Sequence, residues 1–251
     1  MIATARRALY IDGLTVAFGA FQAITNLSLL IEFDEIRAVI GPNGAGKTTL
    51  LDVITGKTRP KKGRVILEPS EDLLRLTDVQ VALCGVGRKF QKPSIFEALS
   101  VENNLRLALR SKSRLLWKEI AYRPSPDDET LIVRVLDEIG MASSAQRLGG
   151  VLSHGEKQWL EIGMLLVQEP KILLLDEPVA GMTDEETERT AALVKRLKSP
   201  ARAIVVIEHD MSFVSEIADV VTVLHEGKLL LEGPMAQVRA DPRVIDVYLG
   251  R

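Results

Sequence analysis

The chain has 251 residues, of which 46% are hydrophobic and 26% charged, and its formal net charge is −2. The length suits one large domain or a domain with an inserted subdomain, and the near-neutral charge excludes strong electrostatic attraction to nucleic acid. Cys84 is the only cysteine, which excludes an internal disulfide. No apolar run approaches the roughly 20 residues of a membrane-spanning helix, and the basic start of the chain lacks a signal-peptide core. We therefore expect a cytoplasmic protein that serves a membrane only through a partner.

Residues 9–40 have the alternation and the glycine breaks of β-strands. Apolar residues alternate from 14 to 18 and again from 27 to 31, and Gly13 and Gly19 interrupt the pattern. Phe18 lies just before Gly19. It is either a core aromatic or a platform on which an adenine base stacks, and the residues alone favour the core position.

Residues 41–49, hereafter the phosphate loop, fit the pattern G-x-x-x-x-G-K-[ST]. Residues 35–40 are typical of a buried strand and residues 48–55 of a helix, so the N–H groups at the helix start point at an anion. Glycines let the backbone curl around a phosphate, Lys47 supplies a positive charge, and the Thr48 hydroxyl is a ligand for Mg²⁺. The predicted nucleotide-binding residues of this loop are Gly41, Pro42, Asn43, Gly44, Ala45, Gly46, Lys47, Thr48 and Thr49.

The middle of the chain changes from mixed to helical composition. In chain order, the predicted elements are a strand over 64–67, a helix over 72–83, a strand from 85 that ends near Gln91, and helices over 101–109 and 131–139. A polar, basic connection with a short helix around Trp117 separates the last two. We predict that residues 94–151 form a helical subdomain inserted into an α/β core made by residues 1–93 and 152–251.

Leu152-Ser153-His154-Gly155 opens a predicted helix that runs to about residue 168. Ser153 is a suitable N-cap, and Glu156 three residues later completes a capping box. A capped core helix explains these residues without any further function.

The segment Ile172–Pro178 is a continuous apolar run followed by two carboxylates and a proline. Such a run is typical of a central parallel strand, and ligands bind at the carboxyl ends of these strands. Neighbouring side chains in a strand point to opposite faces, so Asp176 and Glu177 have different roles. Asp176 suits the Mg²⁺ shell, and Glu177 suits a group that positions or deprotonates the water attacking a γ-phosphate.

A second strand end lies near the C-terminus. An amphipathic helix over 183–198 leads to a strand over 203–207, which ends in Glu208-His209-Asp210. A lone histidine is more often structural, but His209 follows a strand end as Asp176 does and is a candidate for the same site. A helix over 211–217, strands over 220–224 and 228–231, and helices over 234–239 and 243–248 complete the prediction.

In this order and spacing, the motifs resemble the ATP-binding cassette (ABC) ATPases across essentially the whole chain. The matching features are the phosphate loop, Gln91 after a strand, Leu152-Ser153-x-Gly155, the strand ending in Asp176-Glu177-Pro178, and the strand ending at His209. The resemblance implies an α/β P-loop NTPase fold of the ABC ATPase type. Such a fold has a mixed central sheet, an antiparallel N-terminal β region and an inserted α-helical subdomain.

The resemblance also implies hydrolysis of ATP with Mg²⁺. ATP would lie between the phosphate loop of one subunit and Ser153 and Gly155 of another, in a head-to-tail dimer that closes on ATP and opens after hydrolysis. Phe18 would stack on adenine, whereas the residues alone favoured a position for Phe18 in the core. Gln91 would couple the site to a membrane subunit, and His209 would contact the γ-phosphate. The predicted catalytic residues are Lys47, Gln91, Glu177 and His209, and the predicted Mg²⁺-binding residues are Thr48, Gln91 and Asp176.

A narrower resemblance points to the ATPase subunits of urea importers, within the branched-chain amino acid and amide importer group. It is carried by residues 87–93, 152–163 and 176–183 and by the ending Val247–Gly250. It implies transmembrane permease subunits, a second ATPase chain and an external solute-binding protein. The chain would lie at the cytoplasmic face of the inner membrane, and the solute would be urea or a short amide.

Three residues depart from the general family pattern. In the signature motif (residues 152–158), His154 and Glu156 replace a glycine and a glutamine, and Thr183 stands where an aspartate is usual. The change at Thr183 bears on the coupling and relative activity of the two ATP sites. A carboxylate beside a γ-phosphate is unfavourable, so we predict that Glu156 points away from the nucleotide.

Several alternatives stay open. An ATPase for branched-chain amino acid import or for lipid extraction lies within the same family. This alternative stays open because nothing in this chain touches the solute. A soluble cassette acting on DNA or ribosomes would need coiled-coil insertions, a second cassette or a basic surface, which the sequence lacks. A P-loop GTPase or small-molecule kinase would not have the signature motif or His209.

Overall fold

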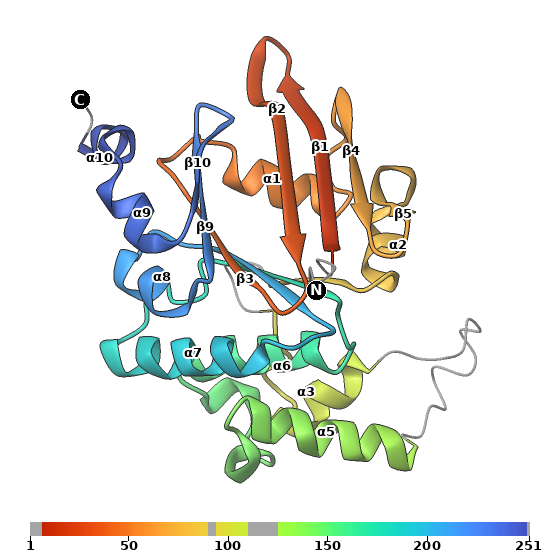
Figure 1. The fold of residues 1–251 in the computed structure, drawn as a ribbon. Helices are drawn as coiled ribbons and strands as arrows, with labels where there is room; N and C mark the ends of the chain where they lie inside the picture. Colours follow the sequence, from red (N-terminus) through yellow and green to blue (C-terminus); the bar gives the residue numbers. More distant parts are fainter. Residues whose placement is uncertain (1–6, 90–93, 110–124, 250–251) are drawn as a thin grey trace, which may run out of the picture.

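The computed structural model describes residues 7–89, 94–109 and 125–249. Gln91 and the short helix predicted around Trp117 lie outside these residues. The described chain forms two β-sheets, with one helix between them and further helices on the far face of the second sheet (Figure 1). The predicted α/β fold, with an antiparallel N-terminal β region and a mixed central sheet, is confirmed.

The first sheet is antiparallel and has the order β2-β1-β4-β5. Its strands are β1 (Arg7–Phe18), β2 (Phe21–Glu32), β4 (Lys62–Leu67) and β5 (Glu71–Asp72). β1 and β2 extend beyond the predicted strands because a short hairpin turn joins them and pairs Phe18 with Phe21. Leu9 and Ile11 of β1 are buried in the core that also contains α1 (Lys47–Ile54), so this sheet covers the helix that follows the phosphate loop.

The second sheet has the order β10-β9-β3-β8-β7-β6. Its strands are β3 (Ile36–Ile40), β6 (Val86–Lys89), β7 (Ile172–Asp176), β8 (Ala203–Ile207), β9 (Val220–His225) and β10 (Lys228–Gly233). All neighbours are parallel except β9 and β10. Every residue of β3, β7 and β8 is buried, as expected for the continuous apolar runs of central parallel strands.

Alternate residues of the central strands pack into two cores. Ile172 and Leu174 of β7 belong to the core shared with the first sheet and α1, whereas Leu173 and Leu175 pack against the helices on the other face. Those helices are α3 (Val101–Ala108), α5 (Pro126–Glu138), α6 (His154–Leu166) and α7 (Asp184–Leu197). A third core joins β3 and β9 to α8 (Met211–Ile217), α9 (Met235–Ala240) and α10 (Pro242–Leu249). None of the described helices combines the length and apolar character needed to cross a bilayer.

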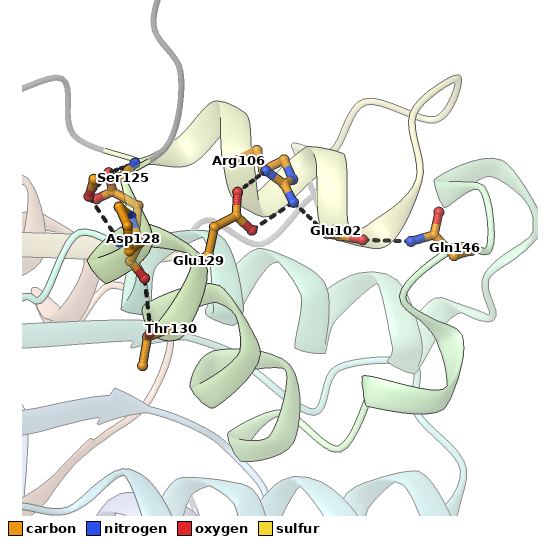
Figure 2. A network of polar contacts seen from close by, with 8 residues as sticks. Glu102, Arg106, Ser125, Asp128, Glu129, Thr130 and Gln146 are labelled. Carbon is orange, nitrogen blue, oxygen red and sulfur yellow. Dashed lines mark hydrogen bonds and ion pairs between the residues drawn. The ribbon is translucent and has the colours of Figure 1, made fainter.

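Ion pairs join α3 to α5 within the predicted helical subdomain (Figure 2). Arg106 of α3 pairs with Glu102 one turn earlier and with Glu129 of α5, where its Nη2 lies 2.7 Å from Oε2. Gln146 donates to the other oxygen of Glu102 at 2.6 Å. These side chains are partly exposed, so each pair contributes at most about 1 kcal/mol. The subdomain boundaries at 94 and 151 stay a prediction.

The helix predicted over 72–83 is wrong in its first half. The segment instead contains the end of β5, a short 3-10 helix at Leu73–Arg75 and α2 (Asp78–Leu83), which ends before the half-buried Cys84. Asp72 accepts a hydrogen bond from the Leu74 N–H at 3.1 Å, and Thr77 forms a capping box with Gln80. Side chains that bond nearby backbone groups compete with helix hydrogen bonds, so they divide the apolar pattern into two short helices.

Candidate functional site

A cavity lies at the carboxyl ends of β3, β7 and β8, next to the start of α1. Its lining residues are Phe21, Ala23, Asn43, Gly44, Ala45, Gly46, Lys47, Thr48, Thr49, Glu177, Ile207 and His209. The fold therefore brings most of the phosphate loop to the same place as Glu177 and His209, which lie far away in the sequence. This edge of a parallel sheet is where α/β proteins bind ligands.

Two glycines of the phosphate loop are required by the backbone geometry. Gly41 has a φ of 147°, and a Cβ there would lie 2.1 Å from the carbonyl oxygen of Leu224. Gly46 has a φ of 101°, and a Cβ there would lie 2.6 Å from the carbonyl oxygen of Ala23. Both distances are well inside van der Waals contact, so a larger residue would displace the backbone. Gly46 is also the N-cap of α1, and it leaves the helix without a side-chain cap.

Lys47, the first residue of α1, folds its ammonium group back over the loop. Nζ donates to the carbonyl oxygens of Gly41 at 2.7 Å and Pro42 at 3.0 Å. Burial lowers the pKa of Lys47, while the charges of Glu177 and Asp176 act in the opposite direction. An arriving phosphate would replace neutral carbonyl partners by charged oxygens, which are stronger acceptors. The cation is therefore already placed where a polyphosphate would need it.

Asp176 is buried at the end of β7, and Arg88 of β6 binds one of its oxygens. Arg88 donates through Nη2 to Asp176 Oδ2 at 2.9 Å and through Nη1 to Asp52 of α1 at 2.6 Å. Asp176 Oδ1 is buried without a hydrogen-bond partner. An orphaned carboxylate oxygen and the Thr48 hydroxyl in the adjacent cavity fit a hydrated Mg²⁺. Among the described residues no cluster of three or more acidic, histidine or cysteine side chains could hold a metal. Besides Thr48, Asp176 and the predicted Gln91, which lies outside the described residues, Mg²⁺ would take its ligands from phosphate and water.

Glu177 and His209 meet at the cavity wall. Oε1 of Glu177 lies 3.4 Å from Nε2 of His209. The backbone N–H of Glu177 donates to the carbonyl oxygen of Ile207 at 2.9 Å, which ties the end of β7 to the end of β8. Glu177 has a φ of 48°, an unfavourable conformation for a residue with a side chain. Such strain is found mainly where it positions a functional group.

Glu208 orders the two loops that carry these side chains. Its carboxylate accepts hydrogen bonds from the N–H groups of Val179 at 3.0 Å and His209 at 2.9 Å. Burial raises the pKa of Glu208, and these hydrogen bonds oppose that shift. Sequence reasoning did not single out Glu208, although its position directly before His209 at a strand end was an available signal.

The β1–β2 hairpin brings an aromatic side chain to the cavity, and that side chain is Phe21. Phe18 and Phe21 pair across the hairpin and are 54% and 61% exposed. The core position that the residues alone favoured for Phe18 is therefore wrong. Phe21 lines the cavity with the phosphate loop, and Phe18 does not. Stacking of Phe18 on adenine stays a prediction, and Phe21 is a candidate that sequence reasoning missed.

The signature motif lies at the start of α6, outside this cavity. Ser153 is the N-cap of α6 and forms the predicted capping box with Glu156. The Glu156 carboxylate accepts hydrogen bonds from Arg147 at 2.6 Å and from the Ser153 N–H at 2.8 Å. Burial alone would raise the pKa of Glu156, but these hydrogen bonds lower it overall. This engagement within the chain supports the prediction that Glu156 points away from a nucleotide.

Two buried ionisable side chains, Lys89 of β6 and Glu161 of α6, influence each other electrostatically. Lys89 is completely buried at the end of β6, and Glu161 of α6 is 6% exposed. Burial lowers the pKa of Lys89, and the charge of Glu161 opposes this shift. Burial raises the pKa of Glu161 to about 7, and the charge of Lys89 opposes that shift in turn. Sequence reasoning missed this pair because nothing local marks either residue as buried.

Two family models match the chain. The model described as "ABC transporter" matches residues 24–180, and the model described as "Branched-chain amino acid ATP-binding cassette transporter" matches residues 228–251. The first match spans more than half of the chain and includes the phosphate loop, the signature motif and the end of β7. The second begins with β10.

Similar proteins extend over nearly the full length of the chain. The high-affinity branched-chain amino acid transport ATP-binding protein BraF of Pseudomonas aeruginosa is 34% identical, over 98% of each chain. The high-affinity branched-chain amino acid transport ATP-binding protein LivG of Escherichia coli is 36% identical, over 96% of this chain and 97% of the relative. Among solved structures, the ADP conformation of MJ1267, an ATP-binding cassette of an ABC transporter, has a TM-score of 0.85 at 27% identity. It covers 98% of this chain and 99% of its own.

Proposed function

This chain belongs to the ABC transporter family of ATPases, and from that premise we propose that it powers an importer for branched-chain amino acids. The observation that carries the proposal is similarity along the whole chain to BraF and LivG, whose names assign them to branched-chain amino acid transport. The family model matched by residues 228–251 has the same description. Urea or a short amide, which the motif resemblance favoured, has no such support among these relatives and becomes the second candidate.

In the proposed mechanism, each site residue acts on one part of ATP. Lys47 and the N–H groups at the start of α1 would hold the β- and γ-phosphates, and Thr48 and Asp176 would hold Mg²⁺, which would supply positive charge against the phosphates. Glu177 orients the attacking water, and His209, 3.4 Å away, contacts the γ-phosphate. Phosphoryl transfer to water requires mainly positioning and charge neutralisation, and this set of residues supplies both.

The proposal includes a head-to-tail pair of ATPase chains. In one chain the phosphate loop lines the cavity, while Ser153 and Gly155 lie outside it at the start of α6. Two opposed chains would place the signature motif of each against the phosphate loop of the other, so that a helix N-terminus faces the triphosphate from both sides. ATP would then favour the closed pair, and hydrolysis would remove that preference.

The partners follow from the same proposal. The chain would act with transmembrane permease subunits and with a second ATPase chain, identical or different, at the cytoplasmic face of the inner membrane. An external solute-binding protein would deliver the solute to the permease. Gln91, outside the described residues, is proposed to reach the Mg²⁺ shell and to couple it to the permease. No nucleic acid takes part.

Transport in the host tests the solute. We would replace the chromosomal copy by Glu177→Gln and measure uptake of labelled leucine and labelled urea at low concentration. Glu185→Gln is the matched control, because Glu185 is exposed and pairs with Arg189 on α7. We expect leucine uptake to be lost and urea uptake to persist. Loss of urea uptake alone would favour the second candidate. If neither uptake were lost, leucine and urea would both be excluded as the transported solute, and the ATPase assignment would stand.

A further inference from the structure

A carboxylate of the same chain already occupies the start of α6. Ser153 Oγ donates to Glu186 Oε1 at 3.0 Å, and the backbone N–H of Gly155 donates to the same carboxylate. A Cβ added to Gly155 would lie 2.6 Å from Glu186 Oε1, so the two segments are in close contact. Ser153 and Gly155 are also the residues proposed to bind the triphosphate held by the opposite subunit. Glu186 and that phosphate would therefore require the same hydrogen-bond donors.

Glu186 reaches this position from the first turn of α7. Its other oxygen, Oε2, accepts a hydrogen bond from the Thr183 N–H at 3.1 Å and completes the capping box of α7. His154 makes a second contact between the same segments, because its Nε2 lies 3.2 Å from the carbonyl oxygen of Ala180. Two of the three residues that depart from the family pattern, His154 and Thr183, thus belong to this contact.

The Glu186 carboxylate is negatively charged where it stands. The hydrogen bond from the Thr183 N–H lowers its pKa most, and those from Ser153 and Gly155 lower it further, against a smaller effect of burial. An anion that is already in place repels a second anion brought to the same donors. A γ-phosphate therefore cannot simply be added to this arrangement.

We propose that Glu186 competes with the γ-phosphate of the opposite subunit's ATP for Ser153 and Gly155, and that it leaves them when the two chains close. The inference rests on the head-to-tail arrangement of the proposed function. The α7 cap uses Oε2 and the competing contact uses Oε1, so the two contacts are made by different oxygens, and a change in the side-chain torsions that keeps Oε2 near the Thr183 N–H would release Ser153. Glu186 does not line its own phosphate-loop cavity. It thus sets the ATP concentration at which the chains close, and not the affinity of the phosphate loop itself.

A purely supportive role for Glu186 predicts the opposite sign. If Glu186 only held Ser153 in place for the phosphate, removal of its charge would loosen the signature motif and weaken closure. If Glu186 competes with the phosphate, removal of its charge strengthens closure. One measurement of the ATP dependence therefore separates the two roles.

The test uses the complete transporter, purified with its permease and ATPase partners in lipid nanodiscs. Glu186→Gln removes the charge and keeps a residue type that completes a capping box. We expect the KM for ATP to fall roughly 3- to 10-fold, the range for release from one competing hydrogen-bonded contact, while kcat stays close to that of the parent. Glu185→Gln removes the same charge from the same turn and should leave KM unchanged. A KM for Glu186→Gln that is unchanged or higher would overturn the proposal.

Two further measurements keep the result decisive. Glu186→Asp keeps the charge, and an aspartate at this position can complete a capping box, as Asp128 does in α5. Its shorter side chain, however, would withdraw from Ser153. It should also lower KM.

Binding of a fluorescent ATP analogue to the isolated chain should be equal in the parent and in Glu186→Gln, since only the phosphate loop is probed. If the parent complex hydrolysed ATP without needing Lys47, the proposed function itself would fail. An unchanged KM in a complex whose activity depends on Lys47 would reject only the role of Glu186.

Discussion

The two helix N-termini proposed to hold ATP differ in how their backbone N–H groups are satisfied. α1 follows Gly46, with no side-chain cap and no acidic residue in its first turn. α6 follows Ser153, with a complete capping box, and both Glu156 and Glu186 contact Ser153. An uncapped helix end attracts an anion directly, whereas a capped end must exchange one partner for another. We therefore expect the nucleotide to bind first at α1 and to engage α6 of the opposite chain in a second step.

The largest effect is expected from Glu177→Gln, which separates chemistry from binding at the α1 end. Hydrolysis should fall roughly 10²- to 10⁴-fold, the range for loss of a general base, because the attacking water is no longer positioned. ATP binding should persist and the closed pair should accumulate. Single-turnover hydrolysis and sedimentation with ATP measure the two parts. Hydrolysis at the parental rate would show that another group positions the water.

Lys47→Ala tests whether the α1 end needs its cation as well as its N–H groups. A hydrogen bond to a charged group contributes about 1.5–3 kcal/mol, so ATP affinity should fall roughly 10- to 100-fold, and hydrolysis should be lost with it. Equilibrium titration of the isolated chain with a fluorescent ATP analogue measures the change. Lys62→Ala, at an exposed position of β4, is the control. Equal affinity in Lys47→Ala and the parent would mean that the helix end binds phosphate without this side chain.

Glu161→Gln tests, through the pH dependence of the free energy of unfolding, whether burial on the inner face of α6 raises the pKa of Glu161. The pKa of Glu161 is raised from 4.5 to about 7 in the folded chain, so its contribution to stability is complete below about pH 4.5 and is lost as pH rises through 7. The free energy of unfolding of the parent should therefore fall by about 3 kcal/mol relative to Glu161→Gln between about pH 4.5 and 7.5. Urea titrations of both proteins at each pH measure this difference. A difference that does not change with pH would show that folding does not raise the pKa of Glu161.

The smallest effect is expected from Glu156→Gln at the capped end of α6. The Glu156 carboxylate contacts Arg147 and the Ser153 N–H, and glutamine also completes a capping box. The KM for ATP should change less than about twofold, in contrast to Glu186→Gln, because Glu156 contacts only groups of its own chain and a partly exposed ion pair of this kind contributes about 0.4 kcal/mol. Steady-state hydrolysis by the complete transporter measures it. A large change would mean that Glu156 faces the nucleotide, contrary to the expectation above.

Sequence reasoning identified the α1 end more completely than the α6 end. The phosphate loop and the pair Asp176-Glu177 follow from local patterns, because a glycine-rich loop and an apolar strand each leave a contiguous signal. His209 was recognised by analogy between strand ends, and the structure places it beside Glu177. The two solutes, by contrast, could not be separated from residues that never touch a solute.

The features that escaped prediction depend on contacts between distant segments. Glu186 contacts Ser153 across 33 positions in the chain, and nothing around Glu186 distinguishes it from an ordinary capping residue. Lys89 resembles any lysine at a strand end until the packing of α6 buries it. The helix predicted over 72–83 failed for a local reason, because side-chain caps at Asp72 and Thr77 overrode the apolar spacing.

The position of β3 has a consequence for the order in which the growing chain matures. β3 leads into the phosphate loop and lies between β8 and β9, so Arg37 pairs with Val205 and Val220. The first sheet, in contrast, has all its strands once residue 72 has been made. Contacts between such distant segments form late and slowly. We expect nascent chains halted before β8 to show no retention of a nucleotide analogue, whereas chains released after β9 retain it. Nucleotide binding would then be among the last properties the polypeptide acquires during synthesis, and a prematurely terminated product would be inert towards ATP.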